Sequence, residues 1–131
     1  MKSYVIAVGI VKFNEEILIL KRNSTKRFDP NKWEFVSGFI KEHEVIEDTV
    51  LREVKEETDQ VGEIVKSAKS FEVTDNYGRW IIVPFIIKVN SKNIILDPKE
   101  HTEFKWIKAK EIEKFDSVSD LKKDLEIVGL L

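Results

Sequence analysis

The sequence GFIKEHEVIEDTVLREVKEETDQ, from Gly38 to Gln60, decides the fold, because a loop leads here into a segment crowded with carboxylates. The part from Val45 to Thr58 contains neither Gly nor Pro. Its apolar residues Ile46, Val50 and Val54 recur every four positions, which places them on one side of a helix. The sequence therefore predicts a helix over this part of the chain.

Three glutamates of the predicted helix lie on one arc. With about 100° of rotation per residue, Glu53, Glu56 and Glu57 share roughly 100° of the circumference, and Glu53 and Glu57 overlap the apolar sector. A solvated face of weak ion pairs is the alternative, but it explains this overlap poorly. Sheltered carboxylates repel one another and lose hydration, so the cluster is costly unless a cation completes it. Oxygen ligands with several negative charges suit Mg²⁺ or Mn²⁺.

The same segment resembles the Nudix box, Gly-x5-Glu-x7-Arg-Glu-aliphatic-x-Glu-Glu-x-Gly-aliphatic. The matching residues are Gly38, Glu44, Arg52, Glu53, Val54, Glu56 and Glu57. The match ends at the helix exit, where the closing Gly of the box is Asp59 and the next aliphatic is Gln60. Asp adopts the left-handed conformation of a helix exit more readily than most residues, although less readily than Gly.

The resemblance implies a ligand set for a divalent metal, Mg²⁺ or Mn²⁺. The ligands would be the carboxylates of Glu53, Glu56 and Glu57. A backbone carbonyl just before the box is the further ligand of the family, and Ser37 would supply it, although the usual Pro-Gly is missing there. Glu53 is the first candidate for the general base. Arg52 is expected to orient Glu53 or Glu56 rather than to touch the substrate.

Two further residues of the box are expected to shape the site. A Cβ at Gly38 would obstruct a tight turn against the acids. Glu44, about two helical turns before Arg52, is expected to fix the junction between loop and helix.

Composition limits the classes that the chain can belong to. With 131 residues, 42% of them apolar and 35% charged, the chain is expected to form one globular domain, residues 1–131. A formal net charge of -2 gives no basic surface for nucleic acid. The absence of cysteine excludes disulfides and thiolate catalysis. The start, MKSYVIAVGIVKF, is typical of neither a signal peptide nor a membrane span, so we expect a cytoplasmic protein.

The other periodic segments predict strands and one closing helix. They are a hairpin of Ser3–Phe13 and Ile17–Leu20, a short strand Trp33–Phe35, two long strands Glu63–Phe71 and Arg79–Val89, a last strand Phe104–Ile107 and the helix Ser119–Val128. Pro84 argues that its strand lies at an edge or contains a bulge. Strands combined with two helices predict an α+β or α/β domain, and the resemblance implies a mixed β-sheet between helices.

Three residues are candidates for substrate binding. Arg22 ends the second strand, where the family often has a basic residue that faces the substrate phosphates. The alternative is that Arg22 is simply a charged residue at the end of a strand. Phe28, in a polar loop, either plugs the core, which we favour, or stacks on a base. Tyr77 lies where dinucleoside polyphosphate hydrolases of the family tend to carry a tyrosine after the box. It is equally suited to a structural role in the turn before the second long strand. Trp33 is expected to pack in the core rather than to bind a base.

The segment from Glu100 to Trp106 resembles the EHxxFxW segment of several nucleotide-hydrolysing Nudix subfamilies. Glu100 or Glu103 would add a carboxylate to the metal site or act as base. The alternative is that either glutamate is only a charged residue leading into the last strand. The pKa of histidine suits acid or base work, but a lone His101 beside strand aromatics is more often structural. His43 and His101 lack metal-ligand spacing, so the sequence gives no support for a zinc site.

The resemblance implies metal-dependent hydrolysis of a nucleoside diphosphate linked to another group. We expect a nucleoside triphosphate pyrophosphohydrolase with a small-molecule nucleotide as its partner. A dinucleoside polyphosphate hydrolase of the diadenosine tetraphosphate type and a non-catalytic Nudix-like nucleotide sensor are the alternatives, and the intact acids argue against the sensor. An isoprenoid diphosphate isomerase is disfavoured because cysteine is absent. A homodimer is left open.

Overall fold

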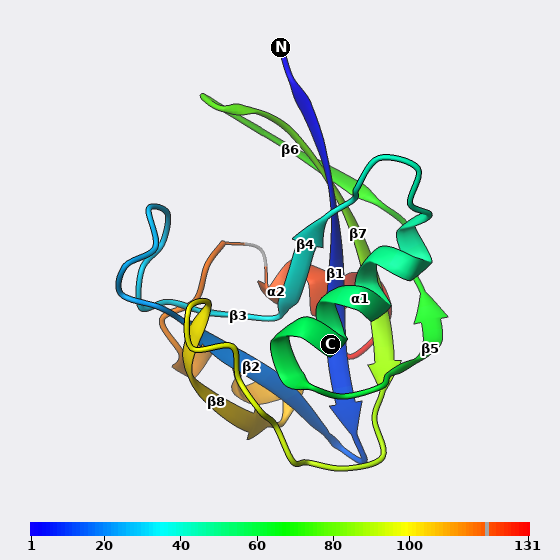
Figure 1. Cartoon of the computed structure of the whole chain (residues 1–131), viewed down its shortest axis with the longest axis vertical. Helices are drawn as coiled ribbons and strands as arrows, with labels where there is room; N and C mark the ends of the chain where they lie inside the picture. The colour runs from blue at the N-terminus through cyan, green and yellow to red at the C-terminus, as the bar shows by residue number, and fades with distance from the viewer. Residues whose placement is uncertain (120) are drawn as a thin grey trace.

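A mixed β-sheet with helices on both sides forms the body of the molecule (Figure 1). The structure is a computed structural model that describes residues 1–119 and 121–131. Its elements are β1 (Ser3–Phe13), β2 (Glu16–Arg22), β3 (Trp33–Glu34), β4 (Val36–Phe39), α1 (Ile46–Thr58), β5 (Glu63–Ser67), β6 (Phe71–Asp75), β7 (Gly78–Lys88), β8 (His101–Ile107), the 3₁₀ helix η1 (Ala109–Lys114) and α2 (Leu121–Val128). No helix among the described residues is long and apolar enough to span a membrane.

Strand β1 organises the sheet. It runs parallel to β7 along nearly its whole length, from Ser3 beside Arg79 to Lys12 beside Lys88. On its other side it pairs antiparallel with β4 and, at its end, with β2. Strand β2 in turn pairs with β3 and β8, and β7 pairs with β5 and β6. Parallel and antiparallel pairs in one sheet confirm the α+β prediction.

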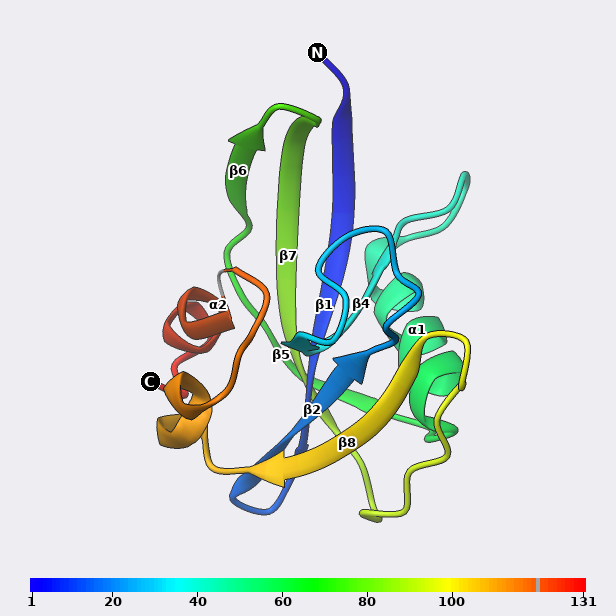
Figure 2. The same ribbon diagram turned by 90° about the vertical axis from the view of Figure 1, so that its left-hand side faces the viewer.

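Two hydrophobic cores lie on opposite faces of the sheet, one under α1 and one under α2 (Figure 2). Successive residues of a strand point to opposite faces. Ala7 and Val11 of β1 accordingly pack toward α1, whereas Val8 and Ile10 belong to the core that contains α2. Trp33 is buried in the core under α2, as predicted.

The predicted first hairpin and the predicted acid-rich helix are both confirmed. The acid-rich helix begins at Ile46, one residue later than predicted, and ends at Thr58 as predicted. Strand β8 begins at His101, three residues before the predicted start. Part of the predicted closing helix, residue 120, lies outside the described residues, and α2 begins at Leu121. The 3₁₀ helix η1 has no counterpart among the predicted elements.

The predicted strand Glu63–Phe71 is wrong. Of the two alternatives for the strand of Pro84, the edge position is also wrong, whereas a register irregularity does occur where β5 pairs with this strand, between Ile64 and Lys66. The predicted strand Glu63–Phe71 is divided, because the chain leaves the ladder between β5 and β6. Strand β7, with Pro84 inside it, lies within the sheet between β1 and these two strands rather than at an edge. The carbonyl of Pro84 accepts a hydrogen bond of 3.1 Å from the N–H of Ala68. The proline nitrogen therefore faces the interruption, where no ladder hydrogen bond is lost.

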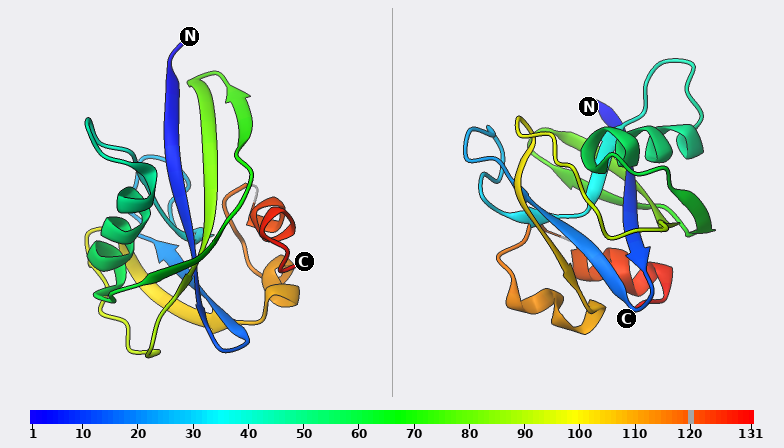
Figure 3. Two further views of the ribbon diagram at one scale, coloured as in Figure 1. Left: turned by 90° about the vertical axis from the view of Figure 1, so that its right-hand side faces the viewer. Right: turned by 60° about the horizontal axis from the view of Figure 1, so that its bottom comes forward.

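The N-terminal part of β1 and the β6–β7 hairpin project together from the body (Figure 3). Their aromatic side chains pack against one another. The rings of Tyr4 and Trp80 stack with centroids 4.7 Å apart, and Phe39 at the end of β4 meets the ring of Tyr4 at 6.0 Å. The projecting strands thus carry a partly exposed aromatic surface beside the loop that enters α1.

The entry to α1 is fixed by Glu44. One of its carboxylate oxygens accepts hydrogen bonds from the Lys41 N–H at 3.1 Å and the Thr49 hydroxyl at 2.7 Å. Arg52, two turns into the helix, donates to both carboxylate oxygens, at 2.8 and 3.0 Å. These bonds, chiefly those from Arg52, lower the pKa of Glu44 from 4.5 to about 2.

The helix ends at Asp59 in the left-handed conformation, with φ 59° and ψ 28°. Its N–H donates to the Lys55 carbonyl at 3.0 Å. Its carboxylate lies 2.9 Å from the Lys55 ammonium in an exposed ion pair. The turn that a glycine makes in the Nudix box is therefore made here by a residue with a Cβ, at some cost in strain.

We predict that Asp59→Gly stabilises the protein by about 0.5 kcal/mol, because relief of strain exceeds the few tenths lost with the exposed ion pair. Denaturant unfolding measures this difference. Asp59→Ala, which loses the same ion pair but keeps a Cβ, is the matched control and should be less stable than the wild type. A clear loss of stability in Asp59→Gly would show that the aspartate side chain makes a needed bond.

We also predict a pH-dependent contribution from Glu44. Its folded pKa lies below its unfolded pKa, so its contribution to stability is present above pH 4.5 and is lost as the pH falls toward about 2. Unfolding free energies of the wild type and Glu44→Gln should therefore converge as the pH is lowered over this range. Glu42→Gln, whose side chain is 88% exposed, is the control and should follow the wild type. A constant difference between wild type and Glu44→Gln would contradict the assignment.

Candidate active site

The three predicted acids of α1 lie beside β4, the strand that contains Ser37 and Gly38 and that stands where the sequence predicted a tight turn. Glu57 is buried, Glu53 is half-buried and Glu56 is exposed. A Cβ added to Gly38 would lie 2.2 Å from the carboxyl carbon of Glu53, so only glycine allows this approach. The backbone at Gly38 and the carboxyl group of Glu53 therefore lie in direct contact.

Arg52 holds the outer part of this acid cluster. Its guanidinium donates to Glu53 at 2.7 Å and, more weakly, to Glu56 at 3.4 Å, while its other nitrogens bind Glu44. The hydrogen bond to Glu44 is the main cause that raises the pKa of Arg52, so this guanidinium stays charged. Arg52 thus connects the helix entry to the acids, in the orienting position that the resemblance implies.

Glu57 is the innermost acid, and 6% of it is exposed. Burial raises its pKa well above the ordinary value, and a hydrogen bond with Glu53 and the nearby charges of Glu34 and Glu100 act in the same direction. A carboxylate in this position carries its charge only if a cation compensates it. Several oxygen donors around one buried acid fit a hard divalent ion such as Mg²⁺ or Mn²⁺.

A row of polar side chains continues inward from Glu57. His101 at the start of β8 lies with Nδ1 3.7 Å from Glu57 Oε1 and with Nε2 2.7 Å from Glu34 Oε2. The other oxygen of Glu34 accepts a hydrogen bond of 2.9 Å from Arg22. Arg22 also donates to the Phe28 carbonyl, at 2.8 and 3.1 Å. The row therefore joins the acids of α1 to the loop that follows β2.

Sequence reasoning assigned no role to Glu34 and left His101 out of the site. A glutamate between Trp33 and Phe35 in an apolar strand was a signal that a polar role was needed there. Its partner could not be read from the sequence, because His101 is 67 residues away and meets Glu34 only through the sheet.

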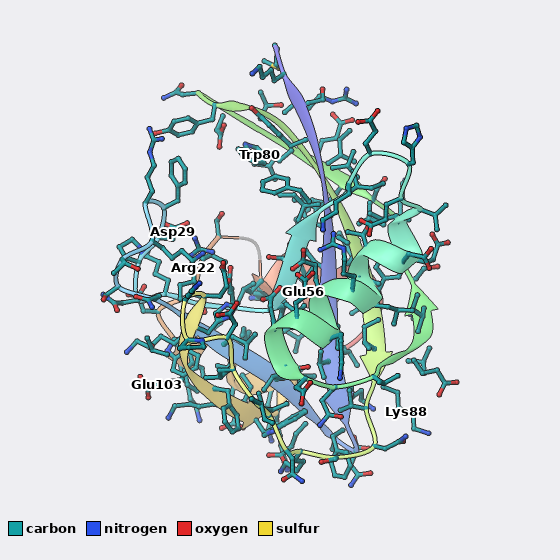
Figure 4. All side chains as sticks on the ribbon, in the orientation of Figure 1. Arg22, Asp29, Glu56, Trp80, Lys88 and Glu103 are labelled. Atoms are coloured by element: carbon teal, nitrogen blue, oxygen red, sulfur yellow. The ribbon has the colours of Figure 1, made fainter. Side chains whose placement is uncertain are left out.

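A cleft of about 1110 Å³ opens over the acids. Most of the predicted site residues line it, namely Arg22, Phe28, Ser37, Gly38, Glu53, Glu56, Glu57, Tyr77 and Glu100. Figure 4 shows Glu56, Arg22 and Trp80 around this region, with Glu103 farther away. Glu44 and Arg52 support the acids without lining the cleft.

The two downstream glutamates differ in position. Glu100 lines the cleft and forms an ion pair with Lys26 of the loop after β2. The carboxylate of Glu103 does not line it; its side chain is 55% exposed and lies 3.3 Å from the Lys21 ammonium on the surface. The structure therefore brings Glu100, but not Glu103, to the acids of α1.

Aromatic rings line the part of the cleft away from the acids. Phe28 is 48% exposed and meets the ring of Tyr77 at 5.3 Å, so it does not plug the core as predicted. The polar loop around Phe28 is held over the cleft by the Arg22 contacts to its backbone, which keeps the ring outside. Tyr4 and Trp80, which sequence reasoning missed, also line the cleft. Tyr4 and Trp80 are paired across the parallel strands β1 and β7, and a single sequence does not show which residues of two distant strands are neighbours.

Comparison with known proteins places this arrangement in a family. The model of the NUDIX domain matches residues 3–125. Nudix hydrolase 5 of Arabidopsis thaliana is 41% identical over 66 residues, which cover 49% of this chain and 22% of that protein. The chain thus spans about a fifth of the length of this relative.

Two solved structures share the fold. The MutT NUDIX hydrolase from Burkholderia pseudomallei superposes with a TM-score of 0.82 at 19% identity, covering 98% of this chain and 99% of that one. The MutT protein from Methanosarcina mazei Go1 gives a TM-score of 0.76 at 24% identity, covering 95% and 91% of the two chains. The domain match includes every strand of the sheet and the acid-bearing helix, and the chain belongs to the Nudix hydrolase family.

Proposed function

We propose that this chain is a divalent-metal-dependent hydrolase of nucleoside diphosphate-linked substrates, and specifically a nucleoside triphosphate pyrophosphohydrolase. The observation that carries the proposal is the buried Glu57, hydrogen-bonded to Glu53 beside Gly38 of β4 and open to a cleft of about 1110 Å³. A protein that only binds a nucleotide has no need for a cluster of acids whose burial costs so much free energy. A nucleotide sensor is therefore the weaker alternative.

The metal would be held by the carboxylates of Glu53, Glu56 and Glu57 and by the carbonyl of Ser37. Mg²⁺ or Mn²⁺ suits these oxygen donors. When bound, the ion neutralises the diphosphate and lowers the pKa of water. Arg52 keeps Glu53 and Glu56 oriented through its bonds at 2.7 and 3.4 Å, and Glu44 keeps Arg52 in place.

Glu53 is the proposed general base, because it is half-buried beside Gly38 of β4 and lines the cleft. Its carboxylate takes a proton from water as the water oxygen forms a bond to phosphorus. The bond between that phosphorus and the bridging oxygen breaks, and the leaving phosphate takes the electron pair. Glu100 also lines the cleft and is the second candidate for this role.

The cleft offers separate surfaces for phosphates and for a base. Arg22, Lys26 and Arg27 supply positive charge along its loop side. Tyr4 and Trp80 on one side, and Phe28 with Tyr77 on another, supply faces on which a base can stack. The presence of two aromatic pairs is the observation that favours a dinucleoside polyphosphate hydrolase as the second candidate function.

We predict that Glu53→Gln and Glu57→Gln each lower kcat at least about a hundredfold at saturating Mg²⁺, because each removes a charged metal ligand. Both variants should remain folded, and metal-free Glu57→Gln should be at least as stable as the wild type, because a neutral side chain relieves the buried charge. Glu47→Gln, exposed on the same helix and outside the cleft, is the matched control. Near-wild-type turnover in Glu53→Gln or Glu57→Gln would refute the ligand assignment.

We further predict that a nucleoside triphosphate is cleaved to a monophosphate and pyrophosphate, while a nucleoside monophosphate is inert. Initial rates for nucleoside triphosphates and diadenosine tetraphosphate should be compared in oxygen-18 water with Mg²⁺. The label identifies the attacked phosphorus. A much higher kcat/KM for diadenosine tetraphosphate would favour the second candidate function instead. Binding of both compounds without turnover would support the sensor.

A further inference from the structure

His101 has an environment that the proposed reaction does not explain. Only 2% of the residue is exposed. Its Nε2 lies 2.7 Å from Glu34, but its Nδ1 has no hydrogen-bond partner among the described residues. That nitrogen lies 3.7 Å from Glu57 Oε1. A buried polar atom without a partner is costly, and in a native protein it indicates a missing ligand or a special role.

The contacts of Glu34 define the state of the imidazole. Arg22 donates to one oxygen of Glu34 at 2.9 Å, which keeps this carboxylate as an acceptor. The N–H of His101 therefore lies on Nε2, where it donates to the other oxygen of Glu34. This leaves a lone pair on Nδ1, the ring nitrogen that lies 3.7 Å from Glu57 Oε1. Metal-binding histidines show the same arrangement, with the second ring nitrogen donating to a carboxylate.

The alternative is an imidazolium ion between two carboxylates. In that state Nδ1 would donate to Glu57 over about 2.7–3.2 Å. The observed separation of 3.7 Å is too long for such a bond. Two ligands that each lie about 2.1 Å from one metal are about 3.0–3.5 Å apart. The observed separation exceeds that range by only a few tenths of an ångström.

We propose that Nδ1 of His101 and Oε1 of Glu57 bind one divalent transition metal, such as Zn²⁺, Co²⁺ or Mn²⁺. Glu34 orients the imidazole, and Arg22 holds Glu34. The ligand atoms of Glu34, Glu57 and His101 all lie within 4.8 Å of one another, and all three residues are buried. An imidazole ligand selects such ions over Mg²⁺, which prefers oxygen.

This position is separate from the one assigned to Glu53 and Glu56 but shares Glu57 with it, so the inference rests on the proposed function for the role of that acid. Glu57 hydrogen-bonds to Glu53 on one side and faces His101 on the other. One carboxylate that faces two donor groups is suited to bridge two ions. The spacing of histidines in the sequence gave no sign of this site, because its ligands come from different elements.

Pulsed EPR of the 131-residue chain with two equivalents of Mn²⁺ tests the assignment directly. The wild type should show the hyperfine coupling of a directly bound histidine nitrogen. His101→Gln, whose amide can still donate to Glu34, should lose the coupling. His43→Gln should keep it, because the His43 side chain is 90% exposed and the chain contains no third histidine. Absence of the coupling in the Mn²⁺-loaded wild type would overturn the inference.

Calorimetric titration separates a ligand from a structural residue. His101→Gln should lower the affinity for Co²⁺ at least about tenfold, and Glu34→Gln should lower it by about tenfold, the usual effect of losing an outer partner. The affinity of both variants for Mg²⁺ should stay within about twofold, because Mg²⁺ uses oxygen ligands. Equal losses for the two ions would mean that His101 only supports the fold, and would overturn the inference.

The two proposals fail in different ways. If the wild type hydrolyses nucleotides with Mg²⁺ but shows no nitrogen coupling with Mn²⁺, the inference about His101 is wrong and the proposed function stands. If the coupling is present but no nucleotide is hydrolysed with any of these metals, the proposed function is wrong and the metal position stands.

Discussion

The contact between Gly38 and Glu53 is the constraint on which the site depends. A Cβ at residue 38 would meet the Glu53 carboxyl at 2.2 Å, so this carboxyl lies against β4 only because residue 38 is glycine. The same helix approaches the sheet at Gly9, where a Cβ would lie 3.0 Å from Val50. Glycine at these two positions leaves room for the Glu53 carboxyl beside β4 and for the Val50 side chain beside β1.

Charge compensation occurs on both sides of the acids. On the outside, Arg52 lies between Glu44 and Glu53 and remains accessible to solvent at the helix entry. On the inside, Arg22, Glu34 and His101 alternate in sign or polarity up to Glu57. The outer guanidinium meets its partners at hydrogen-bond distance, whereas the inner row ends in a gap of 3.7 Å. The inner end of the cluster is therefore where a cation contributes most.

Local patterns predicted the parts of the structure that depend on nearby residues. The helix, its acids and the glycine beside them follow from periodicity and fixed spacing within about two dozen positions, although Gly38 lies in β4 and not in the tight turn expected there. The division between β5 and β6, and the interior position of Pro84, depend on pairing with distant strands. Single-sequence reasoning has no access to such pairing. The exposure of Phe28 likewise depends on a contact with Tyr77, 49 residues along the chain (77 − 28 = 49).

The inner row depends on an irregularity that no sequence pattern marks. Between Lys21 and Arg22 the pairing of β2 with β8 shifts, so Lys21 lies opposite Glu103 while Arg22 lies opposite His101. Regular pairing would place Thr102 opposite Arg22 and break the row, because neighbouring strand residues point to opposite faces. The bulge lets the fork of Arg22 bind Glu34 and the Phe28 carbonyl together. A lysine has a single nitrogen and no such fork, so the loop over the cleft and the buried acids are connected by geometry that only arginine supplies.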